Sequence, residues 1–358
     1  MKIKILHFIF NLGRGGAETM MVRVIKELPE YEHVVVTLFP LNHFGKELIC
    51  DKFICLNLRS LFSLPISIFL FRRTVKKEIP DLVHTHLFWP TVIARLAVPR
   101  KTPLITTIHA FINSSVEYKN WHIRFIDKLT FLWRQTYLIV VANGALKEYL
   151  TFIKRKPIKA WVLYTFVDTV RFKAVPLSIY NPPETFRIVS VGALRTQKNY
   201  SFLIDAFSQL KDANIELHIY GEGDMHNILK QKIEQQGVRV ILKGEVRDIE
   251  NVLPEYHLYV LASTFEGFSL SVLEAMAMGM PLLLSDIASF REQCDEIATF
   301  FSLAIPEEFL IQLRALMAKP QNLMILGEKA RQKAVTQFTL DKHIASLRGI
   351  YRETLGSK

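Results

Sequence analysis

The sequence of 358 residues predicts an α/β protein built from two doubly wound domains. Short apolar runs of strand length alternate with segments of helical periodicity, which is typical of parallel sheets covered by helices on both faces. The alternation stops once, between residues 164 and 186, where Pro182 and Pro183 break helix and central strand, and it then restarts. The length suits two domains better than one.

In the first half, the helix expected at 17–28 has Met20, Met21 and Val24 at helical spacing, directly after a glycine-rich turn. The strands expected in this half are 3–9, 34–39, 53–58, 82–84, 104–108 and 138–142. The other helices expected there are 62–78, 90–98 and 118–134.

In the second half, the same reasoning predicts strands with helices between them and a helical tail from residue 307. The strands expected are 186–191, 216–220, 238–242, 258–262 and 281–284. We therefore expect an N-terminal domain over 1–170, a second domain over 171–340, and a terminal helix over 341–358 that packs back on the first domain. Ligands of such sheets bind at the carboxyl ends of the strands, here in a cleft between the two halves.

Composition narrows the class of protein. No run reaches the ~18 apolar residues of a membrane span. The N-terminus resembles a signal peptide but has no small-residue cleavage site, so we expect no secretion. The three cysteines have neither zinc-site nor disulfide-framework spacing, which fits a reducing cytoplasm.

The net charge of +11 is concentrated in the first half. Residues 1–170 hold 24 Lys and Arg against 12 Asp and Glu, whereas the remainder is nearly balanced. Such asymmetry indicates a nucleic acid, an anionic membrane or an anionic substrate. No helix-turn-helix, zinc or RNA-binding motif is present, so we do not expect nucleic acid as a partner.

The stretch 263–286 contains the most informative pattern. Glu266 and Glu274 flank the start of a helix that follows a buried apolar run. A helix start suits a phosphate, and carboxylates beside it suit the hydroxyls of a sugar or ribose. A structural interpretation stays open here, because Ser271 and Glu274 have capping-box spacing and Glu266 could be a solvated turn acid.

Three glycine-rich loops follow predicted strands, and each also has a plain structural explanation. Gly15 and Gly16 precede the first helix, but they do not form the dinucleotide fingerprint or a P-loop. Gly192 is followed by Arg195 and Lys198, two cations that could neutralise a diphosphate leaving group or could simply be solvated. Gly221 and Gly223 allow another close backbone approach.

Four further polar side chains stand at predicted helix starts or strand ends. Asp248 is expected to cap a helix. His84, His86 and His109 are placed at strand ends, and His109 follows a strongly apolar strand that would bring it to the cleft. No Asp-x-Asp occurs, so no metal–diphosphate clamp is expected.

Together these motifs resemble the retaining glycosyltransferases of family 4, which have the GT-B fold. The resemblance is carried by Gly15-Gly16-Ala-Glu, Gly192-x-x-Arg-x-x-Lys198, Gly221-x-Gly223 and Glu266-Gly-Phe-x5-Glu274-Ala-Met-Ala-x-Gly-x-Pro281. It covers nearly the whole chain and is most specific in the second half. The family's usual Asn-Gly-Val-Asp before the linker appears here as Thr165-Phe-Val-Asp168.

The resemblance implies a role for each matching residue. Glu274 should hold the donor ribose, and Glu266 should face the donor sugar and phosphate. Arg195 and Lys198 should bind the diphosphate, and His109 should lie near the transferred sugar. The remaining implied donor contacts are the backbone amides and loops of Gly15, Gly16, Gly192, Gly221, Gly223, Gly267, Phe268, Ser269 and Leu270. Of these residues, His109, Glu266, Arg195 and Lys198 are the predicted catalytic ones. If Glu274 binds ribose, the helix should begin nearer Gly267 than Ser271.

The implied function is metal-independent, retaining transfer of a hexose-type sugar from a nucleotide-diphosphate sugar to a glycan or lipid-linked glycan acceptor. No enzymic nucleophile stands out, so front-face attack is expected, with no cofactor besides the donor. The alternative is a GT-B hydrolase or epimerase that needs no separate acceptor. The basic segments 61–77 and 118–134 interleave aromatic residues with cations, and we expect them to contact an anionic membrane surface from the cytoplasm. Their alternative is ordinary sheet-covering helices with solvated basic faces.

Overall fold

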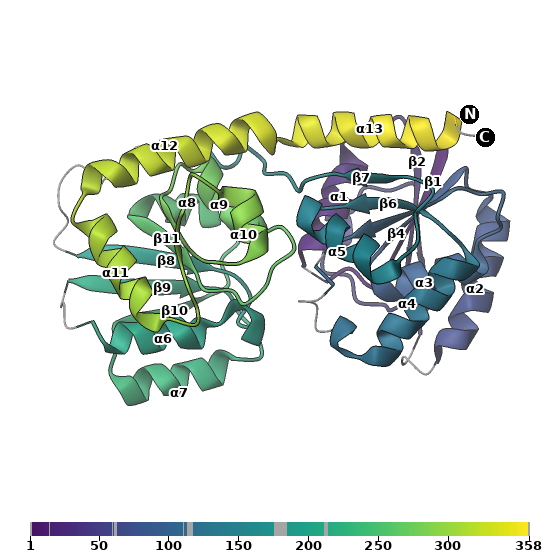
Figure 1. The fold of residues 1–358 in the computed structure, drawn as a ribbon. Helices are drawn as coiled ribbons and strands as arrows, with labels where there is room; N and C mark the ends of the chain where they lie inside the picture. Colours follow the sequence, from purple (N-terminus) through teal and green to yellow (C-terminus); the bar gives the residue numbers. More distant parts are fainter. Residues whose placement is uncertain are drawn as a thin grey trace. The chain divides into compact units, whose positions relative to one another are not determined.

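A computed structural model describes residues 2–13, 15–58, 60, 63–109, 111–112, 117–174, 185–210 and 214–356. The chain divides into two compact units, of which the first is Met1–Thr165 together with Asp341–Lys358 and the second is Phe166–Leu340 (Figure 1). The first division lies slightly before the boundary expected at residue 170.

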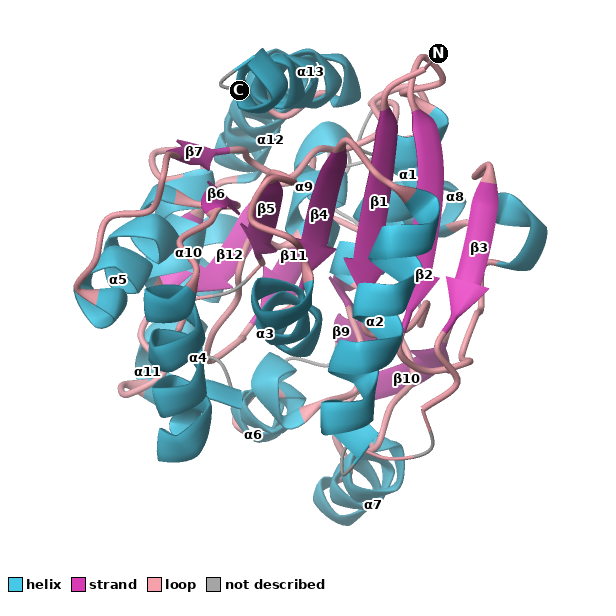
Figure 2. Ribbon diagram, turned by 90° about the vertical axis from the view of Figure 1, so that its right-hand side faces the viewer, coloured by secondary structure: helices cyan, strands magenta, loops and turns pink. Residues whose placement is uncertain are grey.

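The first unit is built on one parallel sheet. Its strands are β1 (Lys4–Ile9), β2 (Glu32–Thr37), β3 (Lys52–Cys55), β4 (Leu82–His86), β5 (Leu104–Ile108), β6 (Tyr137–Val140) and β7 (Ala160–Val162). They lie in the order β3-β2-β1-β4-β5-β6-β7 (Figure 2). The helices are α1 (Gly16–Lys26), α2 (Leu64–Glu78), α3 (Phe88–Ala97), α4 (Trp121–Trp133), α5 (Asn143–Ile153) and α13 (Leu340–Gly356). The order reverses between β1 and β4, where such sheets bind ligands.

The period of two along β1 decides which helices each side chain meets. Leu6 and Phe8 belong to a core cluster that contains residues of α2 and α3, such as Phe71. Ile9 belongs instead to a cluster with Met21 and other residues of α1. His7 alternates with Leu6 and Phe8, so it points to the face that α1 covers.

The second unit repeats this plan with one strand fewer. Its strands are β8 (Phe186–Val191), β9 (Ile215–Tyr220), β10 (Val240–Gly244), β11 (Leu258–Leu261), β12 (Leu282–Ser285) and β13 (Thr299–Phe301), in the order β10-β9-β8-β11-β12-β13. Its helices are α6 (Tyr200–Ser208), α7 (His226–Gln236), α8 (Ile249–Val252), α9 (Leu270–Ala277), α10 (Ala288–Cys294), α11 (Pro306–Met317) and α12 (Pro320–Gln337). All pairings are parallel, and β8 and β11 flank the reversal point.

Most elements lie where the sequence predicts them, and the omissions are two short strands and one helix. The three-residue strands β7 and β13 were missed because so few residues carry no measurable period. Helix α5 was also missed. The search for membrane-spanning helices, made over the described residues, finds none that is long and apolar enough to cross a bilayer.

Candidate active site

The loops after β8 and β11 meet because these two strands are neighbours in the sheet. Lys198 ends a short 3-10 helix (Thr196–Lys198) in the first loop, and its Nζ lies 2.8 Å from Oε1 of Glu266 in the second. The Ser263 hydroxyl donates to the same carboxylate oxygen at 2.7 Å. Both charged side chains are mostly buried, so the sequence-predicted cation and acid form one preorganised pair.

The backbone fixes this arrangement from both sides. The Thr264 amide donates to the carbonyl oxygen of Gln197 at 2.9 Å, and the Gln197 side chain donates to the carbonyl of Phe265 at 3.0 Å. The two loops therefore move as one, and a ligand that contacts Lys198 also meets the Glu266 loop.

Helix α9 begins directly after this loop. Ser269 is its N-cap residue, its backbone amide donates to the Gln293 side-chain oxygen at 3.0 Å, and no side-chain hydrogen bond caps the helix. The first helical amides have no intrahelical partner. Phe268 is buried against the ring of Phe338, with centroids 5.2 Å apart, while Gly267 and Leu270 are partly exposed. The uncapped amides and their partial positive charge suit an anion.

The structure decides two sequence-based expectations for the start of α9. The helix begins at Leu270, so the expected start nearer Gly267 is wrong, because the backbone of Ser269 is held in an extended conformation by Gln293. The capping box is also absent. Ser271 lies inside the helix, where its hydroxyl accepts from Tyr259 at 2.8 Å, so Glu274 is not part of a cap.

Glu274 differs from Glu266 in having no partner. Among the described residues, nothing donates a hydrogen bond to its partly buried carboxylate. Burial raises the pKa of Glu274 to about 7, Arg171 and Lys198 oppose this increase, and Glu250 adds to it. A carboxylate held with empty acceptor positions beside cations is suited to receive the hydroxyl groups of a ligand.

Arg171 is a residue that the sequence analysis missed. Its guanidinium makes two hydrogen bonds to Glu250, of 2.7 and 2.8 Å. The Asp168 side chain accepts from the backbone amide of Arg171 and fixes the turn that presents it. The two partners are 79 positions apart, so no local pattern could reveal them. Asp248 occupies the N-cap position of α8 as expected, but its side chain makes no capping bond.

Arg195 is exposed, and its side chain has no partner within the described part of the chain. It lies three positions before Lys198, on the same loop. The two predicted cations are therefore prepared differently, since Lys198 is fixed by Glu266 and Arg195 stays available to a ligand.

The glycines of the second unit are needed by the fold itself. A side chain at Gly221 would place Cβ 2.1 Å from the carbonyl oxygen of Gly192, and one at Gly223 would meet the Leu194 oxygen at 2.5 Å. At Gly192, a Cβ would lie 2.9 Å from Cε of Lys198. These close approaches explain the glycines without a ligand, and their contact with a donor stays a prediction.

In the first unit, Gly15 is the N-cap residue of α1 and Gly16 begins the helix; both are exposed. The glycine-rich turn thus opens a helix, as predicted, and its role toward a phosphate stays a prediction. Arg14 lies outside the described residues.

His109 directly follows β5, and its Nε2 lies 3.3 Å from Nδ1 of His86. Burial lowers the pKa of His109 to about 4, so the ring is neutral at neutral pH. It can exchange a hydrogen bond with a sugar hydroxyl but does not supply a positive charge. His84 is not at a strand end as predicted, because β4 continues to His86 and buries His84 in the sheet.

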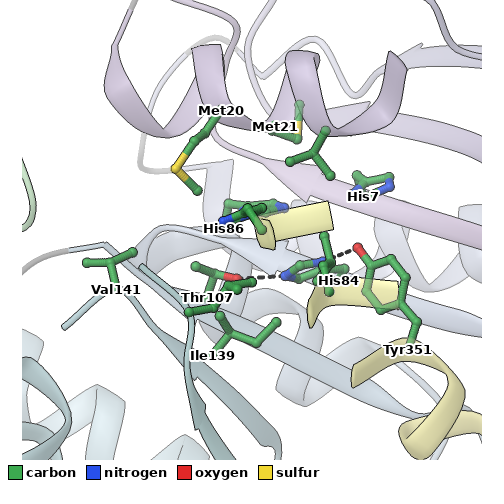
Figure 3. A pocket seen from close by; sticks show the side chains of 13 residues that line it. His7, Met20, Met21, His84, His86, Thr107, Ile139, Val141 and Tyr351 are labelled. Atoms are coloured by element: carbon green, nitrogen blue, oxygen red, sulfur yellow. Dashed lines mark hydrogen bonds between the residues drawn. The ribbon is translucent and has the colours of Figure 1, made fainter. Parts of the chain in front are cut away.

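The histidines of β1 and β4 line a small cavity covered by α1 and α13 (Figure 3). Ligand atoms of His7, His84 and His86 lie within 4.8 Å of one another, the spacing of a metal cluster. However, both ring nitrogens of His84 are engaged, with the Tyr351 hydroxyl at 2.8 Å and the Thr107 hydroxyl at 2.7 Å.

Nδ1 of His7 and Nε2 of His86 are buried without partners in the described structure. The cavity measures about 20 Å³, and none of the described residues that line it is a carboxylate that could offset a buried cation. One water needs about this much space and two polar partners. The donor set therefore suits a bridging water better than a metal ion.

Two family models match the chain, one in each half. Residues 14–171 match the model described as Glycosyltransferase Family 4, and residues 185–339 match the model described as Glycosyl transferases group 1. The first match ends, and the second begins, near the division between the two units. Both halves therefore have the sequence features of glycosyltransferase domains.

Characterised relatives extend over most of the chain. A UDP-Gal:alpha-D-GlcNAc-diphosphoundecaprenol alpha-1,3-galactosyltransferase of Escherichia coli is 24% identical, across 100% of this chain and 98% of the relative. An N-acetylgalactosamine-N,N'-diacetylbacillosaminyl-diphospho-undecaprenol 4-alpha-N-acetylgalactosaminyltransferase of Campylobacter jejuni is 26% identical, across 78% of this chain and 80% of the relative. Both names describe transfer of a sugar to a lipid-linked acceptor.

Solved structures of similar fold include Anabaena HepE in complex with UDP and glucose, with a TM-score of 0.83 at 17% identity over 99% of this chain and 100% of that one. Sucrose-phosphate synthase from Thermosynechococcus elongatus has a TM-score of 0.84 at 16% identity, with the same coverage. At these identities the likeness concerns the fold alone, and it confirms the predicted GT-B fold of two Rossmann-like domains.

Proposed function

Because this chain is a glycosyltransferase of the GT-B fold, we propose that it transfers a hexose-type sugar, with retention, from a nucleotide-diphosphate sugar to a glycan or lipid-linked glycan. The product would belong to a surface polysaccharide or another glycoconjugate. The observation that carries the proposal is the preorganised Lys198–Glu266 pair beside the uncapped start of α9, with the Glu274 carboxylate one turn further along that helix.

The donor would be held by groups of opposite character. The Glu274 carboxylate accepts two ribose hydroxyls, and Lys198, Arg195 and the first amides of α9 face the diphosphate. Negative charge grows on the diphosphate as the sugar bond breaks, and donors fixed in advance stabilise that charge without reorganising. UDP is the nucleotide we test first, since the galactosyltransferase relative uses UDP-Gal and HepE binds UDP.

The sugar itself would lie against Glu266 and His109. His109 is neutral and contributes a hydrogen bond to a sugar hydroxyl, while Glu266 receives another. We propose front-face attack by the acceptor hydroxyl, without a metal ion, because the cations of the donor loop can neutralise the leaving diphosphate. Gly15 and Gly16 would approach the phosphate at the amino end of α1.

The acceptor sets the place of reaction. Both relatives above are named for acceptors linked to undecaprenol diphosphate. A lipid-linked acceptor presents its glycan at a membrane surface, so we propose that the enzyme works as a peripheral protein on the cytoplasmic face of the cell membrane.

The donor assignment is tested by two substitutions with matched controls. Glu274→Ala should weaken UDP binding by about 10- to 100-fold, the loss expected for hydrogen bonds to a charged group. Lys198→Ala should lower the transfer rate by about 100- to 1,000-fold, as removal of one preorganised donor does elsewhere. Glu234→Ala and Lys232→Ala change an exposed acid and an ion-paired lysine on α7 of the same unit, and both should behave as wild type.

Binding would be measured by calorimetry and by a thermal-shift panel of UDP, GDP and ADP, with transfer measured from the cognate sugar. If Glu274→Ala and Lys198→Ala both retained wild-type binding and rate, the site assignment would be wrong. Release of free sugar, or of an epimerised donor, at the same rate with and without acceptor would favour the hydrolase or epimerase instead.

A further inference from the structure

Helix α4 carries five large apolar side chains on the outside of the first unit. The exposed fractions are 76% for Trp121, 58% for Phe125, 54% for Leu129, 55% for Leu132 and 61% for Trp133. A helix of a globular unit normally turns such residues inward. Together they form what we call the α4 stripe, and nothing in the described structure covers it.

The α4 stripe is a continuous band and not a scatter of single residues. At 3.6 residues per turn, its five members fall within an arc of about 120°. The opposite arc is buried and contains Ile123, Asp127, Thr130 and Phe131. The helix therefore has two apolar faces, of which only one is used by the core.

The inner face fixes which way the stripe points. The Asp127 carboxylate pairs with the buried Arg95 guanidinium and accepts from the Tyr118 hydroxyl at 2.8 Å. The Tyr149 hydroxyl joins the same network, 2.9 Å from Arg95. Because this network resists rotation of α4, exposure of the stripe is a fixed property of the unit.

Cations border the α4 stripe, and no exposed acid lies within the helix. Arg124 and Lys128 lie beside it, each held over the Phe152 ring at 4.9 and 4.8 Å from its centroid. At the far end, Arg100 stacks on Trp133 at 5.3 Å. Lys119, just before α4, and Lys101, next to Arg100, are exposed as well. Asp127, the single acid of α4, is buried in its ion pair.

We propose that the α4 stripe inserts into the interfacial region of an anionic lipid bilayer. An apolar band with a tryptophan at each end and a basic border has the composition of helices that lie in the plane of a membrane surface. The inference rests on the peripheral placement in the proposed function and deepens it by naming the surface that contacts the membrane. Binding to a bare bilayer needs neither donor nor acceptor, so it can fail independently of the proposed sugar transfer.

Charge decides between a bilayer and a second copy of the chain. In a symmetric dimer through the α4 stripe, the cations that border one copy would approach those of the other, and like charges repel. Anionic headgroups complement the same cations. Helix α2 strengthens this complementarity, since it exposes Ile66 and Phe69 followed by Arg72, Arg73, Lys76 and Lys77. Residues 61 and 62 of that predicted basic segment lie outside the described structure.

The test is co-sedimentation of the full chain with vesicles of phosphatidylcholine and phosphatidylglycerol in equal parts, and with phosphatidylcholine alone. Wild type should bind the anionic vesicles more tightly than the neutral ones, and the preference should weaken as salt screens the headgroups. The variant Trp121→Ser/Phe125→Ser/Leu129→Ser should bind at least about 100-fold more weakly, because most of its inserted apolar area is gone.

A matched control removes exposed apolar residues elsewhere. Ile228→Ser/Ile311→Ser changes side chains that are 57% and 61% exposed on α7 and α11 of the second unit, and it should bind vesicles as wild type does. Unchanged UDP-dependent thermal shifts would show that each variant is folded. The insertion depth of the α4 stripe is measured with bromine-labelled lipids, which should quench the fluorescence of Trp121 and Trp133.

Three results would overturn the proposal: wild type that does not bind anionic vesicles at low salt, the triple variant binding as wild type, or a concentration-dependent dimer that the triple variant abolishes while neither protein binds vesicles. The last result would assign the α4 stripe to a second copy. Vesicle binding by a chain that lacks transfer activity would leave this proposal standing and remove the proposed function.

Discussion

In each unit, the described residues include a cation–carboxylate pair with both side chains mostly buried, and the two pairs differ in how their hydrogen bonds are satisfied. Arg95 and Asp127 in the first unit are almost fully buried, and two tyrosine hydroxyls and a threonine satisfy most of their hydrogen bonds, although Nε of Arg95 has no partner among the described residues. Lys198 and Glu266 in the second unit lie on loops at the strand ends, where one serine completes only part of theirs. A closed network holds a helix in place, whereas an open one leaves donors and acceptors for a ligand.

A second contrast concerns the groups that titrate near neutral pH. The first unit buries neutral histidines from β1, β2, β4 and α13. The second unit buries two histidines, His218 and His257, and it also holds an acid, Glu274, whose pKa is raised toward neutrality. Acid should therefore destabilise the first unit more than the second, in which protonation of Glu274 opposes the effect of the histidines. All four tryptophans lie in the first unit, so its unfolding can be followed separately.

The largest expected effect is acid unfolding of the first unit. Burial lowers the pKa of both His109 and His343 to about 4, and it also lowers the pKa of His7, His84 and His86. The unfolded chain binds these protons near pH 6.5 and the folded unit does not, so stability falls as pH drops from 6.5 toward 4. By linkage, His109 and His343 should each lower the free energy of unfolding of the first unit by about 2 kcal/mol between pH 7 and pH 5.

The measurement is urea unfolding followed by tryptophan fluorescence. The midpoint should fall by about 2 M between pH 7 and pH 5, given a typical m-value. His343→Gln should reduce this pH dependence, because glutamine can still donate to the Tyr164 carbonyl but does not titrate. His122→Gln, which changes an exposed histidine of α4, should leave it unaltered. Equal urea midpoints at pH 7 and pH 5 would show that the buried histidines do not make the first unit sensitive to acid.

The same contrast shows what could be predicted from sequence. Arg195, Lys198, Glu266 and Glu274 could be proposed from the sequence because each lies in a short local motif, and the structure shows that adjacent parallel strands bring the loops that follow them together. Their assembly follows from strand order alone. The histidine cavity could not be found this way, because Tyr351 reaches His84 from 267 positions away.

Local details of the site escaped prediction for a related reason. The start of α9 is decided by Gln293, which lies 24 positions after Ser269 and has no distinguishing pattern. The exposure of the α4 stripe also had to come from the structure, since its periodicity equally suits a core-facing helix with apolar residues on both faces.

The second prediction breaks the closed ion pair. Arg95→Met should destabilise the first unit by about 3–5 kcal/mol, because it leaves Asp127 buried without its cation. Arg348→Met makes the same chemical change at the exposed pair with Glu30 in the same unit, and it should lower the urea midpoint far less. Both are measured from the tryptophan-reported urea transition at pH 7. Equal losses would mean that burial does not distinguish these pairs.

The third predicted effect is the smallest, and it is a stabilisation: removal of the Glu274 charge should make the second unit more stable. The folded-state pKa of Glu274, about 7, lies above its ordinary value. Its ionised form therefore costs stability above pH 7, and this cost disappears as pH falls through 7 toward 4.5. Glu274→Gln should stabilise the second unit by about 1 kcal/mol at pH 8, a gain of about 2–4 °C in Tm, and by nothing measurable at pH 5.

The gain should appear in the calorimetric transition that tryptophan fluorescence does not follow, while UDP affinity falls. Glu234→Gln, at an exposed acid of α7 in the same unit, should change neither quantity. A loss of stability at pH 8 would mean that Glu274 supports the fold, as Asp127 does. A gain accompanied by weaker UDP binding would mean that the second unit keeps an unfavourable acid because the nucleotide requires it.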